Sequence, residues 1–224
     1  MIANAPALIP SPTLELERPK LRGVLHSWAF FASVALGVVL ATTTNAEAAV
    51  PAALYAASVA ALLGTSALYH RVQWSVAGRA LVRRLDHAMI FVLIVGTYTP
   101  ISFVALRDHG VGMVFGGVCA ASLLGFVITV GWVGAPKWLL AIIYVLVGWL
   151  GVLRVPELLA EVGMSGTLML FLGGVLYTVG ALVYALKRPN PSPRVFGYHE
   201  VFHALVIAAA AVHFAFVAFW VLPH

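Results

Sequence analysis

Charged residues are scarce in this sequence, because Asp, Glu, Lys and Arg make up 9% of the 224 residues and hydrophobic residues make up 62%. A soluble domain carries about 25% charged residues, so this chain has too few charges to cover a water-facing surface. The sequence therefore indicates an integral membrane protein. Its net charge of +5 is interpreted as short basic loops between membrane segments, and not as a nucleic-acid-binding surface.

Cysteine and lysine are also rare, which excludes an internal disulfide and one class of seven-helix protein. Cys119 is the single cysteine, so the chain cannot form an internal disulfide. The three lysines, Lys20, Lys137 and Lys187, all lie away from the middle of an apolar run. A microbial rhodopsin needs a lysine in the middle of its last helix to form a Schiff base, so that class of seven-helix protein is excluded.

Long apolar runs dominate the rest of the chain. A helix needs about 20 residues to cross the hydrocarbon core of a bilayer, and seven stretches approach or exceed that length. A proline-containing segment, residues 1–19, precedes them and is predicted to be a mobile cytoplasmic tail. The sequence predicts an all-α membrane protein in which residues 20–224 form one seven-helix transmembrane domain, with spans near 24–43, 48–69, 86–106, 111–131, 138–155, 165–186 and 198–221.

The basic residues predict the orientation of these spans. Of the 13 Lys and Arg residues, all but Arg107 and Arg154, and therefore 11, fall in segments on the same side as the N-terminus. Cytoplasmic loops carry such an excess of positive charge. We therefore predict that the N-terminus lies inside and the C-terminus outside.

Five polar side chains are predicted to lie at the inner end of the helix bundle. Span 2 ends there with Ser66 and His70, span 3 begins there with Asp86, and span 7 begins there with His199 and His203. An ionisable group inside a membrane span is costly and by default indicates a functional site. His70 and His199, which are 129 positions apart in the chain, are thus expected at the same depth in the membrane.

Three histidines of this set have the spacing of a metal site. His199 and His203 are four residues apart and therefore share one helix face, and His70 could supply a third nitrogen. Three histidines with an open fourth position are typical of a catalytic zinc ion, which lowers the pKa of its bound water towards neutrality. Asp86 could then accept a hydrogen bond from that water, and Ser66 could donate one to a bound group.

The same segment matches the zinc-protease motif H-E-x-x-H at His199, Glu200 and His203. A protease of that kind usually takes its third zinc ligand from downstream, where His213 lies roughly 15 Å further along the helix at 1.5 Å per residue and His224 lies at the outer end. His70 is therefore the better third ligand, and the intramembrane protease stays a minor alternative.

Three nearby residues are given lesser roles. Glu200 is expected to reach water at the inner interface. His87 is expected to face away from Asp86 and not to bind the metal. His26, at the inner end of the first span, is a weaker candidate ligand.

The segments "SALYHR", "RRLDHAMIFVLIVGTYTPI" and "GYHEVFHALVIAAAAVHF" resemble the haemolysin III family, whose members are similar to the progestin and adiponectin receptor family. The resemblance implies zinc bound by His70, His199 and His203, with Asp86 near a bound water and Ser66 beside it. It also implies hydrolysis of lipid amides such as ceramides for some members, and a role in membrane lipid balance for bacterial ones. The chain departs from the family in one motif. The family's E-x-x-N-x-x-x-H motif, aligned on His26, has Glu and Asn at the positions where this chain has Pro19 and Arg22.

These observations together predict a zinc-dependent hydrolase of lipid amides or esters in the bacterial inner membrane, with its site near the cytoplasmic face and a membrane lipid as substrate or ligand. A non-catalytic sensor or receptor, in which zinc joins spans 2 and 7, is the alternative from another class. A pore-forming cytolysin is disfavoured because no span carries a continuous polar stripe.

Overall fold

The structure is a computed structural model that describes residues 19–110, 112–132 and 136–223. These residues form α-helices with short 3₁₀ and π segments, and no β-strand occurs among them. The all-α prediction is confirmed. The α-helices are α1 (Val24–Thr43), α2 (Ala49–Arg71), α3 (Val76–Pro100), α4 (Gly112–Gly131), α5 (Lys137–Gly148), α6 (Val155–Leu186) and α7 (Tyr198–Phe216).

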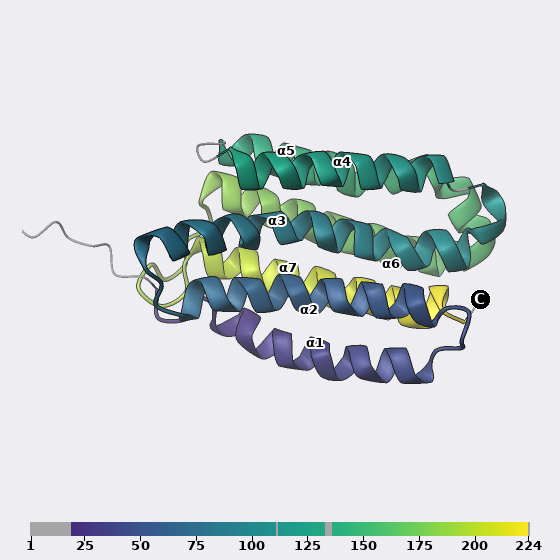
Figure 1. Ribbon diagram of the computed structural model, residues 1–224, viewed down its shortest axis with the longest axis horizontal. Coiled ribbons are helices and arrows are strands. Elements are labelled where there is room, and N and C mark those ends of the chain that lie inside the picture. The colour runs from purple at the N-terminus through teal and green to yellow at the C-terminus, as the bar shows by residue number, and fades with distance from the viewer. Residues whose placement is uncertain (1–18, 111, 133–135, 224) are drawn as a thin grey trace, which may run out of the picture.

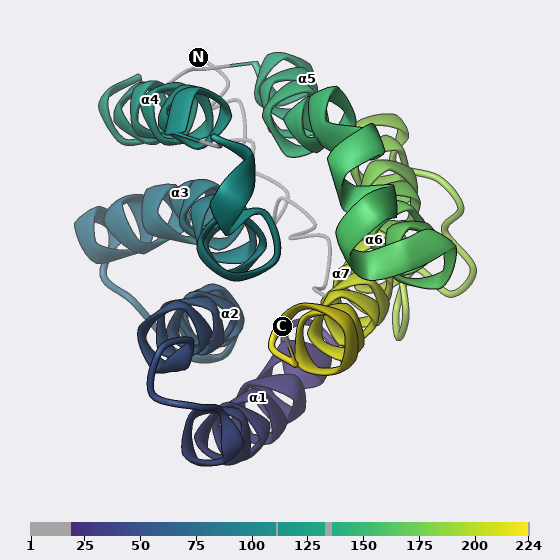
Figure 2. The same cartoon turned by 90° about the vertical axis from the view of Figure 1, so that its right-hand side faces the viewer.

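The helices lie side by side along the long axis of the molecule (Figure 1). Viewed end-on, they follow one another around a ring from α1 to α7, and α7 closes the ring by packing against α1 as well as α6 (Figure 2). This closure brings the first and last helices of the chain together, which positions the site described below.

Six helical segments of the described chain are long and apolar enough to cross a membrane. Five contain one long α-helix each, and the sixth, Trp138–Leu186, has 49 residues. It includes α5, a 3₁₀ segment η3 (Trp149–Arg154) and α6, and the helix is interrupted at Gly163, where φ is 67° and ψ is 179°. A membrane-spanning protein is confirmed, while the seven crossings and their orientation stay predictions.

Helix α3 begins ten residues before the predicted span. The Ser75 hydroxyl accepts a hydrogen bond from the Gly78 N–H at 3.2 Å and caps the helix. Such a cap satisfies one of the unpaired N–H groups of a first helical turn. The apolar run begins only near Asp86, so hydropathy alone placed the boundary too late, and Asp86 lies inside the helix rather than at its start.

The predicted N-terminal tail, residues 1–19, lies outside the described residues up to residue 18. The segment that follows is tied to the loop before α7. The backbone N–H groups of Lys20 and Leu21 donate to the carbonyl oxygens of Arg194 and Val195, at 3.0 and 3.2 Å. The segment before α1 and the segment before α7 therefore pack together at one end of the bundle.

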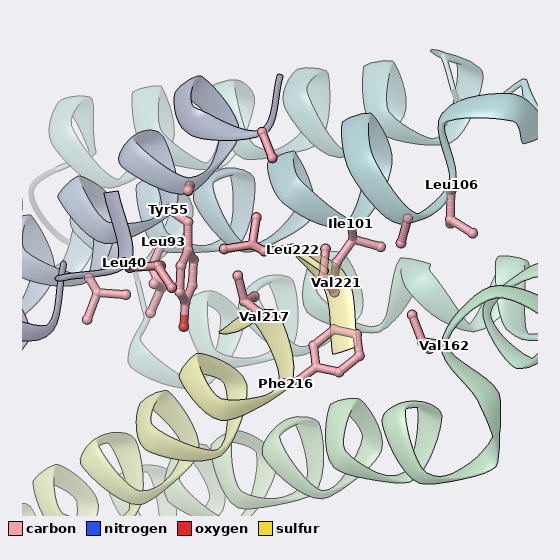
Figure 3. Close-up of a cluster of buried hydrophobic side chains, with 14 of the residues drawn as sticks. Leu40, Tyr55, Leu93, Ile101, Leu106, Val162, Phe216, Val217, Val221 and Leu222 are labelled. Atoms are coloured by element: carbon pink, nitrogen blue, oxygen red, sulfur yellow. The ribbon is translucent and has the colours of Figure 1, made fainter. Parts of the chain in front are cut away.

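A hydrophobic core runs between the helices and is densest away from these two segments (Figure 3). Phe216, Val217 and Val221 are fully buried there, where α7 continues into the π-helical segment η4 (Val217–Val221). They pack with side chains from the other helices, including Leu40, Tyr55, Leu93 and Val162. Apolar packing thus holds together the end of the bundle opposite the segments before α1 and α7.

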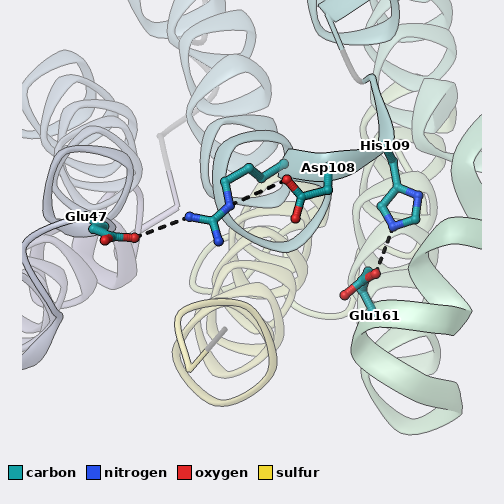
Figure 4. A network of polar contacts seen from close by, with 5 residues as sticks. Glu47, Asp108, His109 and Glu161 are labelled. Carbon is teal, nitrogen blue, oxygen red and sulfur yellow. Dashed lines mark hydrogen bonds and ion pairs between the residues drawn. The ribbon is translucent and has the colours of Figure 1, made fainter.

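Charged side chains gather on the connections beyond that core (Figure 4). Arg107 bridges Glu47 at 3.3 Å and Asp108 at 3.9 Å. The His109 Nε2 lies 2.8 Å from the Glu161 Oε1 and links the connection after α3 to α6. The segments that the sequence assigns to the outer side therefore meet at one end of the bundle.

Candidate metal centre

Three histidines converge at the end of the bundle where α2 finishes and α7 begins. His70 lies in the last turn of α2, and His199 and His203 lie in the first two turns of α7. One potential ligand atom from each of the three lies within 4.8 Å of the other two. The structure thus brings together the three residues that the sequence proposed as ligands, across 129 positions of chain.

The geometry of this histidine cluster, His70, His199 and His203, fits a metal ion. The Nε2 atoms of His70 and His199 are 3.2 Å apart. Two nitrogen ligands of a tetrahedral zinc ion, each at about 2.0–2.1 Å from the metal, are separated by about 3.3 Å. The Nδ1 of His203 is buried without a hydrogen-bond partner among the described residues. Three imidazoles of this arrangement could hold zinc with one position left open.

His26 of α1 stacks on the ligand candidate His203. The ring centroids are 3.7 Å apart and the planes differ by 8°. His26 is 3% exposed, and neither ring nitrogen makes a hydrogen bond with the described residues. His26 is not one of the three potential metal ligands. Its ring packs against the His203 ring and fixes the orientation of that ring.

Glu200 is engaged away from the cluster. Its side chain is 1% exposed, and its Oε1 lies 2.7 Å from the Nε of Arg22. Its Oε2 accepts a hydrogen bond from the Gly197 N–H at 2.8 Å, which caps the first turn of α7. The expectation that Glu200 reaches water is wrong. The sequence did not indicate its partner, because Arg22 lies outside the apolar runs and 178 positions before Glu200.

Gly23 fixes the position of the segment before α1 against His70. It has a left-handed conformation with φ of 77°, which a residue with a Cβ adopts only with strain. A Cβ at this position would collide with the Cβ of His70. The backbone therefore approaches the third ligand candidate as closely as a glycine permits.

A cavity of about 170 Å³ begins at the cluster and extends into the bundle. Ser66, Asp86, His199 and His203 line its polar end. Most of the remaining wall is apolar, with Leu62, Leu93, Ile94, Leu140, Phe202 and Val206 among the side chains. The two residues proposed to act beside the metal therefore face the same space as the histidines.

His87 also lines this cavity, contrary to the expectation that it faces away. Its Nε2 lies 3.4 Å from the hydroxyl of Tyr184 on α6. Adjacent helical residues are separated by about 100° around the axis, and the cavity is broad enough to contact both Asp86 and His87. The helical angle alone could not reveal this, because the width of the cavity depends on α5 and α6.

The fold and this site define a polytopic α-helical membrane protein with a potential three-histidine metal centre. A family model described as "Haemolysin-III related" matches residues 14–214. The chain belongs to the haemolysin III family.

Two curated relatives agree with this assignment. The chain is 32% identical over 136 residues to the "Hemolysin-3 homolog" of Bacillus subtilis (strain 168), which covers 61% of each chain. It is 28% identical over 179 residues to "Hemolysin-3" of Bacillus cereus, covering 80% of this chain and 78% of the relative. The match to the first relative thus spans less than two thirds of that protein's length.

Proposed function

We propose that the protein is a zinc-dependent hydrolase that cleaves an amide or ester bond of a membrane lipid. The observation that supports this function best is a group of three histidines, two of which, His199 and His203, line the polar end of an apolar cavity together with Asp86. A receptor for a small polar ligand would not need a mostly apolar cavity, whereas a lipid acyl chain matches such walls.

Each residue has a distinct role in this proposal. His70, His199 and His203 hold the metal, and a zinc ion bound there would supply Lewis-acid chemistry and an activated water. The Asp86 carboxylate accepts a proton from the attacking water as general base. Ser66, which lines the same cavity, donates a hydrogen bond to the bound group. The apolar walls bind the acyl chain and exclude bulk water from the reacting bond.

The placement in the membrane is part of the proposal. With α5 and α6 each crossing once, the chain crosses seven times, N-terminus inside and C-terminus outside, in the bacterial inner membrane. The start of α1 and the end of α7 lie at opposite ends of the bundle (Figure 1), as an odd number of crossings requires. The histidine cluster then lies near the cytoplasmic face, at the depth of inner-leaflet head groups.

A second function, a sensor in which zinc joins two helices, is favoured by one specific observation. The His70 and His199 rings meet directly, although α2 and α7 are not consecutive in the ring of helices (Figure 2). A metal bound between them would join two helices that α1 separates in the ring. Such a structural ion contributes to folding stability outright.

Metal content and hydrolysis measured on one set of variants test both functions. Purified protein should contain one zinc ion per chain by elemental mass spectrometry, and vesicle-reconstituted protein should release fatty acid from N-acylated or O-acylated lipids. His70→Ala, His199→Ala and His203→Ala should each lose zinc and hydrolysis together. His109→Ala, at the far end of the bundle, is the matched control and should retain both.

The two functions predict different results for the wild-type protein. Zinc without any released fatty acid, together with a bundle that melts on chelation, would favour the sensor. Zinc retained in all three cluster variants would contradict both functions.

A further inference from the structure

His213 is a buried histidine that the proposed reaction does not use. It lies ten residues after His203 on α7, which corresponds to roughly 15 Å along the helix at 1.5 Å per residue. It is 7% exposed and lines the end of the cavity remote from the cluster. It also lines a second cavity of about 70 Å³, nearer the end of the bundle where Arg154 lies. His213 thus stands in the wall that the two cavities share.

One ring nitrogen of His213 makes a hydrogen bond within the protein. Its Nε2 lies 3.0 Å from the carbonyl oxygen of Leu170 on α6. A carbonyl oxygen only accepts, so Nε2 carries the hydrogen and, in a neutral imidazole, Nδ1 is an acceptor. The Cδ2 and Nε2 edge of the ring packs so closely on Gly173 that no Cβ would fit there. The Nδ1 edge is therefore turned away from Gly173.

The Nδ1 of His213 is buried without a hydrogen-bond partner among the described residues. A buried acceptor left unpaired is destabilising, so a bound molecule that brings a donor to this atom would stabilise the arrangement. Two threonine hydroxyls in the wall of this cavity already have acceptors of their own. Those of Thr97 and Thr178 donate to the carbonyl oxygens of Leu93 and Gly174, at 2.9 and 2.8 Å.

The hydroxyl of Tyr98 also has an acceptor, because it donates to the Gly148 carbonyl at 2.9 Å. The protein thus offers an acceptor at this end of the cavity, and the hydroxyls of Thr97, Thr178 and Tyr98 are used elsewhere. A ligand with a donor of its own would pair the free acceptor.

We propose that His213 is a ligand-binding residue that accepts a hydrogen bond from a hydroxyl group on the acyl chain of the bound lipid. The inference rests on the proposed function, which places the carbonyl of the lipid at the histidine cluster. An extended alkyl chain advances about 1.25 Å per carbon for C–C bonds of about 1.5 Å. The distance of roughly 15 Å along the helix then places the hydroxyl near carbon 12. The rest of the chain lies against the second cavity.

Binding of matched fatty acids to the wild-type protein in detergent tests this inference. 12-Hydroxyoctadecanoate should displace a fluorescent fatty acid at about fivefold lower concentration than octadecanoate, the size expected of one additional hydrogen bond. 6-Hydroxyoctadecanoate is the control for position. It should bind no better than octadecanoate, because its hydroxyl would lie against the apolar middle of the cavity. A hydroxyl at carbon 6 that improves binding as much as one at carbon 12 would overturn the inference.

His213→Leu removes the acceptor, and the folded variant should bind octadecanoate and 12-hydroxyoctadecanoate equally. If this variant does not fold, the comparison of the three acids on the wild-type protein decides alone. Equal binding of octadecanoate and 12-hydroxyoctadecanoate to the wild type would overturn the role of His213 while leaving an acyl-binding cavity. Binding of none of the acids would overturn it together with the acyl cavity of the proposed function, and hydrolysis measured separately would then show whether the function itself survives.

Discussion

The Nε of Arg22 lies 2.7 Å from the Oε1 of Glu200, and this carboxylate is 1% exposed. The ion pair joins the segment before α1 to the first turn of α7, one residue after His199. Because Glu200 also caps α7 through the Gly197 N–H, its two oxygens are both occupied by structural contacts. The glutamate of the H-E-x-x-H motif therefore stabilises the helix that carries two histidines of the cluster.

Replacing Glu200 should affect stability and not chemistry. Glu200→Gln leaves Arg22 without its counter-charge in a mostly buried place, which costs about 2 kcal/mol of unfolding free energy. The melting temperature in detergent should fall, while zinc per folded chain and hydrolysis per folded chain should remain near wild type. Glu161→Gln, which disturbs a more exposed pair at the other end, should have little effect on melting. An inactive but stable Glu200→Gln protein would contradict this role.

Asp86→Asn should remove the proposed general base and keep the metal. The amide has nearly the shape of the carboxylate, so the cavity wall should persist. Hydrolysis should fall by roughly 100-fold or more, the usual scale for loss of a general base. Zinc content measured on the same preparation is the control. Hydrolysis unchanged in this variant would remove Asp86 from the reaction.

Gly23→Ala should disturb the histidine cluster from outside it. The new Cβ meets the Cβ of His70, and the alanine must also adopt a positive φ, which costs on the order of 1 kcal/mol or more. We expect a lower melting temperature and weaker zinc retention during dialysis against a chelator. Gly110→Ala is a matched control, because Gly110 has φ of 62° and nothing near its Cβ position. That variant should lose stability without losing zinc, and equal zinc loss in both would refute the role of the contact.

The predicted orientation can be measured with fused reporters. A periplasm-active enzyme fused after His224 should be active, and the same enzyme fused after Arg188 should be silent, because 11 of the 13 basic residues would then lie inside. The reverse pattern would move the histidine cluster to the outer face. Equal activity of both fusions would contradict a single crossing by α7.

The convergence of the histidines was predictable because depth in a membrane follows from chain direction. A span that ends inside and one that begins inside must bring their ends to the same level, so the grouping of His70 with His199 needed no knowledge of packing. The spacing of His199 and His203 placed them on one face. These arguments depend only on local sequence and on the bilayer as a fixed reference.

The contacts of Arg22, His26 and His87 were not predictable in the same way. Arg22 lies outside the apolar runs, and nothing in its neighbourhood indicates that Glu200, 178 positions later, is its partner. The stacking of His26 on His203 depends on closure of the ring of helices between α1 and α7. Rotation of a helix about its axis is set by its neighbours, and the near-uniform apolar composition of these spans gives little indication of it.

The backbone hydrogen bonds from Lys20 and Leu21 to Arg194 and Val195 have a consequence for biosynthesis. The ribosome makes the acceptor residues more than 170 positions after the donors, and His199 and His203 follow them directly. The N-terminal segment must therefore wait beside the unfinished bundle until the last helix is synthesised. The histidine cluster forms only at that moment, so a nascent chain holds at most one of the three proposed ligands during almost all of its insertion.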